Sequence, residues 1–190
     1  MTPGERIRAG LDALARTAAE TASQIPEVER IAARCAATLR DGGTLFFAGN
    51  GGSAADAQHI ATEYVVRFRA ERRPFSAVAL TTDTSLLTAA GNDLGFEQIF
   101  ARQVEALCRA GDLLILHSTS GASANLCAAA RAARRLGVPV AAFLGKGGGA
   151  LRALADLAIV VPSEDTSRIQ EIHLALEHLI VEAVEEELGR

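Results

Sequence analysis

The sequence predicts an α/β fold of three layers, in which helices cover both faces of a parallel sheet and further helices precede it. Short apolar runs alternate with longer segments of helical periodicity along the 190 residues, and this alternation is typical of parallel sheets. Two of the apolar runs end in loops rich in glycine or serine, which are the usual ligand-binding positions in such sheets. No linker or low-complexity segment divides the chain, so we expect one domain over residues 1–190.

The elements follow from periodicity and from helix start and stop signals. Residues 1–40 are predicted to form two helices, from about Pro3 to Gln24 and from Pro26 to Arg40, with a proline in the first turn of the second and glycines after its end. Five apolar runs are predicted strands: Thr44–Ala48, Ala77–Leu80, Leu113–Leu116, Val140–Leu144 and Leu157–Val161. Further helices are expected to begin at the two special loops, to run from Phe96 to Cys108, and to run from Thr166 to Leu188.

Composition and charge favour a globular protein without a broad nucleic-acid interface. Hydrophobic residues make up 49% of the chain, and the net charge is −4. The three cysteines (Cys35, Cys108 and Cys127) lack the spacing of a disulfide framework, so we expect reduced, buried thiols. No apolar run has the length of a membrane span, and the first residues lack the apolar core of a signal peptide. We therefore expect a cytoplasmic protein with neither nucleic acid nor membrane as a partner.

A phosphorylated ligand suits the two special loops, Gly49–Ser53 and Ser118–Ser123. Each ends a predicted strand and opens a helix, where free amides and the helix dipole favour an anion. Each loop alone is equally consistent with a tight turn and a helix cap, and Ser53 with Asp56 has capping-box spacing. The glycine loop also fits the loose dinucleotide pattern, but Asp83 comes later than the acidic residue that this pattern requires about 20 positions on.

Polar side chains on two predicted helices are candidates for chemistry. His59 and Glu63 lie four residues apart on one helix face, which suits zinc ligation, a base with its orienting partner, or a plain surface pair. The last helix carries Gln170 and His178, separated by about 12 Å of rise, so helical geometry alone makes a shared metal site strained. On the same helix, His173 is interpreted as a partner of Glu177 or as a packed ring.

Together these motifs resemble the phosphoheptose isomerases, a family of SIS (sugar isomerase) proteins. The resemblance rests on Gly49-Asn50-Gly51-Gly52-Ser53, His59-x-x-x-Glu63, Gly91-Asn92-Asp93, Ser118-Thr119-Ser120-Gly121, and Arg168-Ile169-Gln170-Glu171 with His178. It implies a flavodoxin-like SIS fold and a homotetramer with active sites at subunit contacts. It also implies conversion of D-sedoheptulose 7-phosphate to D-glycero-D-manno-heptose 7-phosphate, the first step towards nucleotide-activated heptose.

The resemblance further implies a role for each matching residue. Glu63 would be the catalytic base and His178 its acid/base counterpart. One zinc ion per subunit would be bound by His59, Glu63, Gln170 and His178. The substrate would be contacted by Asn50, Gly51, Gly52, Glu63, Asn92, Asp93, Ser118, Thr119, Ser120, Ser123 and Gln170.

Three positions depart from the family pattern and leave substrate preference open. Ala54 replaces a histidine or polar residue, Ala122 replaces an asparagine, and His117 stands where an apolar residue is usual, as a core ring or an extra phosphate contact. Two alternatives remain, a non-catalytic SIS protein that binds the replication initiator and a sugar-phosphate sensor. The presence of both Glu63 and His178 favours the enzyme over the initiator-binding protein, and an isomerisation assay would separate it from the sensor.

Overall fold

The computed structural model describes residues 1–189, which form an α/β fold of twelve main elements. In chain order these are α1 (Pro3–Thr21), α2 (Ile25–Arg40), β1 (Leu45–Gly49), α3 (Gly52–Val65), β2 (Ala77–Ala79), α4 (Thr84–Asp93), α5 (Ala101–Leu107), β3 (Leu113–Ser118), α6 (Ala124–Arg135), β4 (Val140–Leu144), β5 (Leu157–Val160) and α7 (Thr166–Leu188). The predicted fold class is confirmed, and all five predicted strands are present.

The five strands form one parallel sheet in the order β2-β1-β3-β4-β5. Strand β2 is added on one side of β1, whereas β3, β4 and β5 are added in turn on its other side. The direction in which successive strands are added therefore reverses between β1 and β3. In open α/β sheets, ligands bind at the carboxyl ends of the strands beside such a reversal. The loops after β1 and β3 are the two special loops of the sequence, and the fold therefore places them next to each other.

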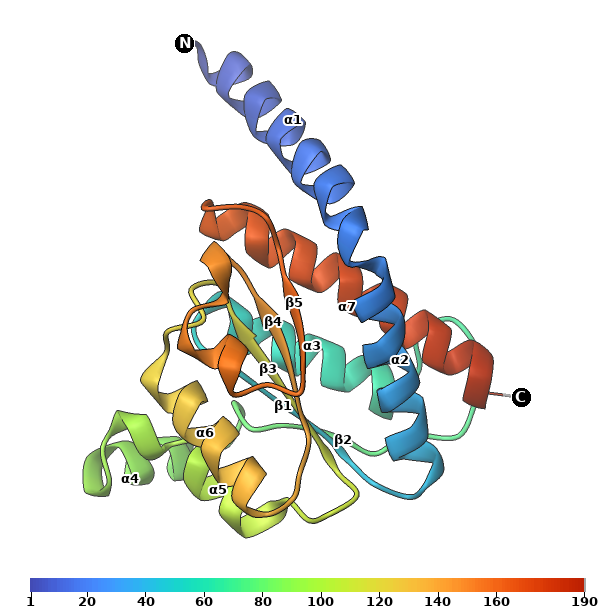
Figure 1. The fold of residues 1–190 in the computed structure, drawn as a ribbon, viewed down its shortest axis with the longest axis vertical. Coiled ribbons are helices and arrows are strands. Elements are labelled where there is room, and N and C mark those ends of the chain that lie inside the picture. Colours follow the sequence, from blue (N-terminus) through green and yellow to red (C-terminus); the bar gives the residue numbers. More distant parts are fainter. Residues whose placement is uncertain (190) are drawn as a thin grey trace.

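Helices cover both faces of the sheet (Figure 1). On one face α2, α3 and α7 share a core with Phe47, and on the other α4, α5 and α6 share a second core with Phe46. These adjacent residues face opposite cores because side chains alternate along a strand. The first helix, α1, projects beyond the body of the protomer (Figure 1). Within residues 1–189, none of the helices is long and apolar enough to span a membrane.

Two local predictions are corrected by the structure. The segment between Phe96 and Cys108 is not one helix but a 3-10 turn followed by α5, and α4 was not predicted at all. The two leucines of α4 are only partly buried and Ala90 alone is buried, so the apolar periodicity of this helix is weak. Ser53 does not cap α3, because this helix begins at Gly52 after a turn at Gly51 with φ of 56° and has no side-chain cap.

Candidate active site

The two loops at the reversal point present the uncapped starts of two helices. Neither α3 nor α6 has a side-chain hydrogen bond at its N-cap residue, Gly51 and Ser123 respectively. The backbone N–H groups of a first helical turn have no partner within the helix, and the helix dipole adds partial positive charge there. A Cβ at Gly49 would overlap the backbone of Ser53, so the chain turns this closely only with glycine. The site is therefore suited to an anion held by backbone amides.

A pair of asparagine side chains joins these loops. Asn50 donates to Oδ1 of Asn125 at 3.0 Å, and Asn125 donates to Oδ1 of Asn50 at 2.8 Å. Asn125 is buried in the first turn of α6, where its Oδ1 also accepts the backbone N–H of Leu126 at 2.9 Å. Sequence analysis proposed Asn50 as a substrate contact and did not identify Asn125. In the protomer the Asn50 amide is engaged with Asn125, which fixes the spacing between the loops.

The serine loop is shaped by its own hydroxyl groups and by glycine. The Ser118 Oγ accepts the backbone N–H of Gly121 at 3.0 Å, and the Ser120 Oγ accepts that of Ala122 at 3.2 Å. Because a hydroxyl that accepts one bond still has a hydrogen to donate, these groups remain able to bind a phosphate oxygen. Gly121 has φ of 62°, and a Cβ there would overlap the backbone of Gly148. The loop thus keeps its shape through close backbone packing.

The polar cluster predicted on α3 is completed by α7. The Nε2 atoms of His59 and His178 lie 2.9 Å apart, and the His59 Nε2 lies 3.6 Å from Oε1 of Glu63. One nitrogen or oxygen from each of the three side chains lies within 4.8 Å of the others. Burial and the charge of His59 lower the pKa of His178, an effect that Glu63 opposes. The lowered pKa favours the neutral imidazole, which is the form that accepts a proton or binds a metal.

This donor set fits a zinc ion. Two imidazole nitrogens and a carboxylate are zinc ligands, and zinc–nitrogen bonds of about 2.0–2.1 Å in a tetrahedron place two nitrogens roughly 3.3 Å apart. The observed separation of 2.9 Å between the two Nε2 atoms is close to this spacing. A mixed set of nitrogen and oxygen donors without cysteine is typical of a catalytic rather than a structural zinc site.

Other predicted site residues lie away from this cluster in the protomer. The Gln170 amide lies against Gly52, where a Cβ would overlap it, and near Asp56. Burial raises the pKa of Asp56, while His117 and the hydrogen bond with Gln170 act in the opposite direction. Gln170 therefore lies at the start of α3, and its role as a metal ligand stays a prediction. Asn92 and Asp93 end α4, which packs on the opposite face of the sheet from α3 and α7.

His117 is a core ring rather than part of the exposed loop surface. It is buried on β3, and its Nε2 lies 2.6 Å from Oε1 of Glu177 on α7. Burial alone would lower the pKa of His117, but the charge and hydrogen bond of Glu177 raise it. Because Glu177 is engaged there, His173 is not its partner: the His173 Nε2 instead donates to the carbonyl oxygen of Leu144 at 3.0 Å. Of the two interpretations of His173, the packed ring is correct.

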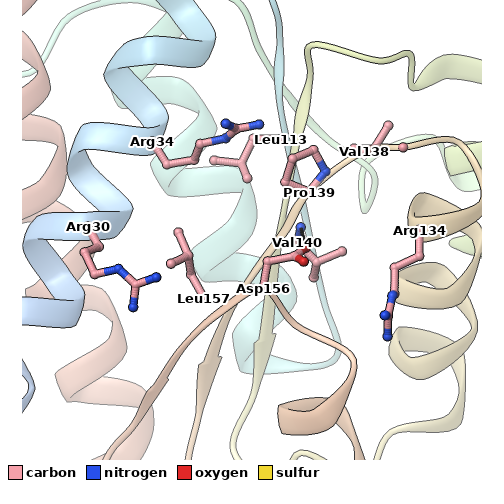
Figure 2. A pocket seen from close by; sticks show the side chains of 10 residues that line it. Arg30, Arg34, Leu113, Arg134, Val138, Pro139, Val140, Asp156 and Leu157 are labelled. Carbon is pink, nitrogen blue, oxygen red and sulfur yellow. Dashed lines mark hydrogen bonds between the residues drawn. The ribbon is translucent and has the colours of Figure 1, made fainter.

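A large cleft lies at the other end of the sheet. It has a volume of about 490 Å³ and is lined by residues at the amino ends of β4 and β5, with Arg30 and Arg34 from α2 and Arg134 from α6 (Figure 2). Arg134 lies in the last turn of α6, where a cation complements the negative end of the helix dipole. The cleft contains none of the His59, Glu63 and His178 side chains, so we place the candidate active site at the two loops and at the contact between α3 and α7 instead.

The strand order, the two loops and the cluster between α3 and α7 indicate a sugar isomerase (SIS) domain. The sequence profile of the SIS domain family matches residues 10–145. A phosphoheptose isomerase from Roseiflexus sp. (strain RS-1) is 52% identical over 184 residues, which cover 97% of this chain and 92% of the relative.

Solved structures agree with this similarity. That of a phosphoheptose isomerase from Neisseria gonorrhoeae matches with a TM-score of 0.93 and 40% identity, over 97% of this chain and all of the other. That of a phosphoheptose isomerase from Francisella tularensis matches with a TM-score of 0.95 and 35% identity, over 98% of this chain and all of the other. The chain belongs to the phosphoheptose isomerase family.

Proposed function

We propose that the protein interconverts D-sedoheptulose 7-phosphate and D-glycero-D-manno-heptose 7-phosphate, the first step towards nucleotide-activated heptose. The observation that carries the proposal is the proximity of Glu63 and His178 to His59, across the contact between α3 and α7. Helix α3 begins at the glycine loop, so His59, Glu63 and one anion-binding helix start belong to a single element. Membership of the family supports the substrate assignment.

Aldose–ketose isomerisation requires a group for a carbon-bound proton and a group for an oxygen-bound proton. The Glu63 carboxylate is assigned to the proton that moves between adjacent carbons through an enediol(ate). The neutral His178 imidazole is assigned to the proton that moves between the neighbouring oxygens. Each positioned acid or base typically contributes about 10² to 10⁴ in rate.

The phosphate group is assigned to the serine loop. The hydroxyl groups of Ser118, Thr119, Ser120 and Ser123 and the first-turn amides of α6 would donate to its oxygens. Gly51, Gly52 and the start of α3 would contact the rest of the sugar phosphate. Asn50 would act there through its link to Asn125.

Zinc is the proposed metal, one ion per subunit, with His59, Glu63 and His178 as ligands and Gln170 as the fourth. Bound zinc would polarise the substrate carbonyl and so stabilise negative charge on its oxygen. Elemental analysis tests the assignment: wild-type protein purified with zinc should contain it, and His59→Ala should lose it while remaining folded. Zinc-free wild-type protein with activity unaffected by EDTA would contradict the proposal.

A cytoplasmic homotetramer is the proposed assembly. On α1, Ile7 and Leu11 are exposed, and an apolar cleft of about 240 Å³ lies between the α1–α2 junction and α7, with Leu176 and Leu179 in its lining. Exposed apolar surface of this kind is usual where subunits meet. Asn92 and Asp93 would then reach the site of a neighbouring subunit. Light scattering at micromolar concentration checks this, and a monomer would contradict it.

Direct observation of the reaction is the decisive test of the function. The protein is incubated with D-sedoheptulose 7-phosphate, and the products are followed by NMR. Appearance of the aldose phosphate is expected. Binding of the substrate without turnover by the metal-loaded protein would instead indicate a sugar-phosphate sensor.

A further inference from the structure

An aromatic ring from a loop outside the predicted site lies against His178. The 66–76 loop joins α3 to β2 and carries Phe68, whose ring stacks on His178 with 5.4 Å between centroids and 11° between planes. His59 meets the same imidazole edge-on, with 5.1 Å between centroids and planes at 90°. The orientation of the His178 ring is therefore limited by Phe68 on one face and by His59 at an edge.

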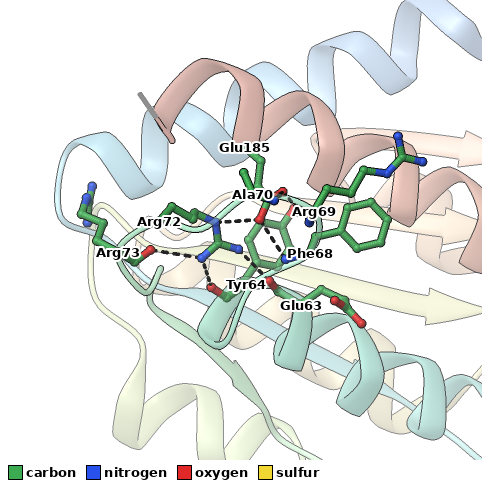
Figure 3. Close-up of polar contacts among 8 residues, drawn as sticks. All are labelled: Glu63, Tyr64, Phe68, Arg69, Ala70, Arg72, Arg73 and Glu185. Atoms are coloured by element: carbon green, nitrogen blue, oxygen red, sulfur yellow. Dashed lines mark hydrogen bonds and ion pairs between the residues drawn. The ribbon is translucent and has the colours of Figure 1, made fainter.

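Glu185 on α7 holds the part of the loop that carries Phe68. Its carboxylate accepts the backbone N–H groups of Phe68, Arg69 and Ala70 at 2.8, 2.9 and 3.1 Å (Figure 3). The Glu185 side chain is only 4% exposed. Three consecutive amides bound to one buried carboxylate fix the loop backbone, and this placement sets where the Phe68 ring lies.

Arg72 joins this carboxylate to the end of α3. Its Nε donates to Glu185 at 2.9 Å, and its Nη1 and Nη2 donate to the backbone carbonyls of Tyr64 at 2.9 Å and Glu63 at 2.7 Å (Figure 3). The Arg72 side chain is 1% exposed, and its guanidinium lies 4.1 Å from the ring centroid of Phe75. One buried ion pair thus fastens the backbone of Glu63 to the helix that carries His178.

We propose that Phe68 is a positioning residue for His178 and that the Arg72–Glu185 ion pair holds it in place. The stacked ring limits rotation of the imidazole about its bond to Cβ, so the Nε2 atom stays directed at His59 and Glu63. The inference rests on the proposed function, because its kinetic test uses the isomerisation. Simple apolar cover of His178 is the competing explanation, and a leucine would provide that cover equally well.

The kinetic test compares Phe68→Leu, Phe68→Tyr and the control Phe96→Leu, in metal-loaded protein with metal content measured for each variant. Phe96 is an exposed phenylalanine on the opposite face of the sheet, whereas Phe68 is half-buried. An aromatic pair contributes beyond its buried area, so Phe68→Leu should lower kcat roughly 3- to 10-fold. KM should change less than about 2-fold, since the phosphate is bound elsewhere. Phe68→Tyr keeps the planar ring and should recover most of kcat.

A second measurement does not depend on catalysis. In protein with ¹³C-labelled histidine, the ring protons of His178 are assigned by their loss in His178→Gln. The ring current of a stacked Phe68 should shift these protons upfield in the wild type, and Phe68→Leu should remove the shift. Absence of the upfield shift, wild-type kcat in Phe68→Leu, or equal impairment of the leucine and tyrosine variants would each overturn the proposal. A wild-type protein without isomerase activity would overturn the proposed function instead, and the NMR measurement would then decide on the positioning alone.

Discussion

Replacing Arg72 with methionine should destabilise the protein strongly, because the guanidinium serves three buried groups at once. The change leaves the Glu185 carboxylate without its charged partner and removes the Arg72 donors from the carbonyls of Glu63 and Tyr64, of which the Tyr64 carbonyl still accepts the N–H of Phe75 at 3.1 Å. Breaking a buried ion pair in this way costs about 3–5 kcal/mol. For a chain of this length, each kcal/mol lowers the melting temperature by about 2–4 °C, so a decrease of roughly 6–20 °C is expected.

Arg69→Met is the matched control. Arg69 also pairs with a glutamate of α7, Glu182, but its side chain is 66% exposed. Exposed pairs contribute at most about 1 kcal/mol. Thermal and urea unfolding followed by circular dichroism, at one protein concentration, compares the two variants. If Arg72→Met unfolds within about 1 kcal/mol of Arg69→Met, the buried pair does not stabilise the fold as argued.

The same pair predicts a pH dependence with a defined sign. Burial alone would raise the pKa of Glu185, but the three backbone N–H groups and the charge of Arg72 together hold it below its usual value. A lowered pKa contributes stability that is complete above the ordinary glutamate range and is lost as the pH falls through the folded-state value. Unfolding free energies between pH 7 and pH 3 should therefore fall less steeply in Glu185→Gln than in the wild type. Equal slopes would contradict this.

Three further changes test the site and its support. Glu63→Gln should lower kcat roughly 10³-fold while substrate still binds, because the amide cannot accept the carbon-bound proton. If this variant still exchanges solvent deuterium into the substrate at a near wild-type rate, Glu63 is not the base. Ser120→Ala should lower kcat/KM about 10- to 150-fold, because the substrate phosphate loses one hydroxyl donor. Unchanged steady-state kinetics in both Ser120→Ala and Ser118→Ala would place the phosphate elsewhere. His117→Leu should lower the free energy of unfolding in urea by about 3–5 kcal/mol, because it leaves the Glu177 carboxylate buried and unpaired. Adding Glu177→Leu should recover most of that loss. A double variant no more stable than the single one would contradict this.

The fold class and both ligand loops were predictable because they depend on local signals. Apolar runs that end in Gly49–Ser53 and Ser118–Ser123 indicate strand-to-helix turns, and both turns are present. The order of the strands is not a local property, so no local pattern indicates that β1 and β3 are neighbours. Helix α4 is not predicted because its local signal is weak. It lies against the core on one side only, and its two leucines are partly buried, so the sequence shows little helical periodicity there.

Among the site residues, too, some are marked by local spacing and others are brought together only by packing. His59 and Glu63 were identified by their spacing on one helix, and the structure brings them together with His178. That third group could not be located by spacing, since it lies on α7 and approaches α3 only through packing of the two helices. The supporting pairs Asn50–Asn125 and Arg72–Glu185 join residues 75 and 113 positions apart, so no short pattern marks them.

The ligand loops and the side-chain cluster on α3 and α7 are held in place by different kinds of contact. The serine loop is shaped by contacts within and next to it: the Ser120 Oγ accepts the N–H of Ala122 at 3.2 Å, and Gly121 packs directly on Gly148. Alanine at position 122 therefore removes a possible contact with the ligand without removing a bond that shapes the loop. The His59, Glu63 and His178 cluster is built from side chains on α3 and α7, whose alignment depends on buried pairs between distant residues. Substitutions in the loops should accordingly alter substrate preference, whereas loss of the pairs between α3 and α7 should impair the chemistry itself.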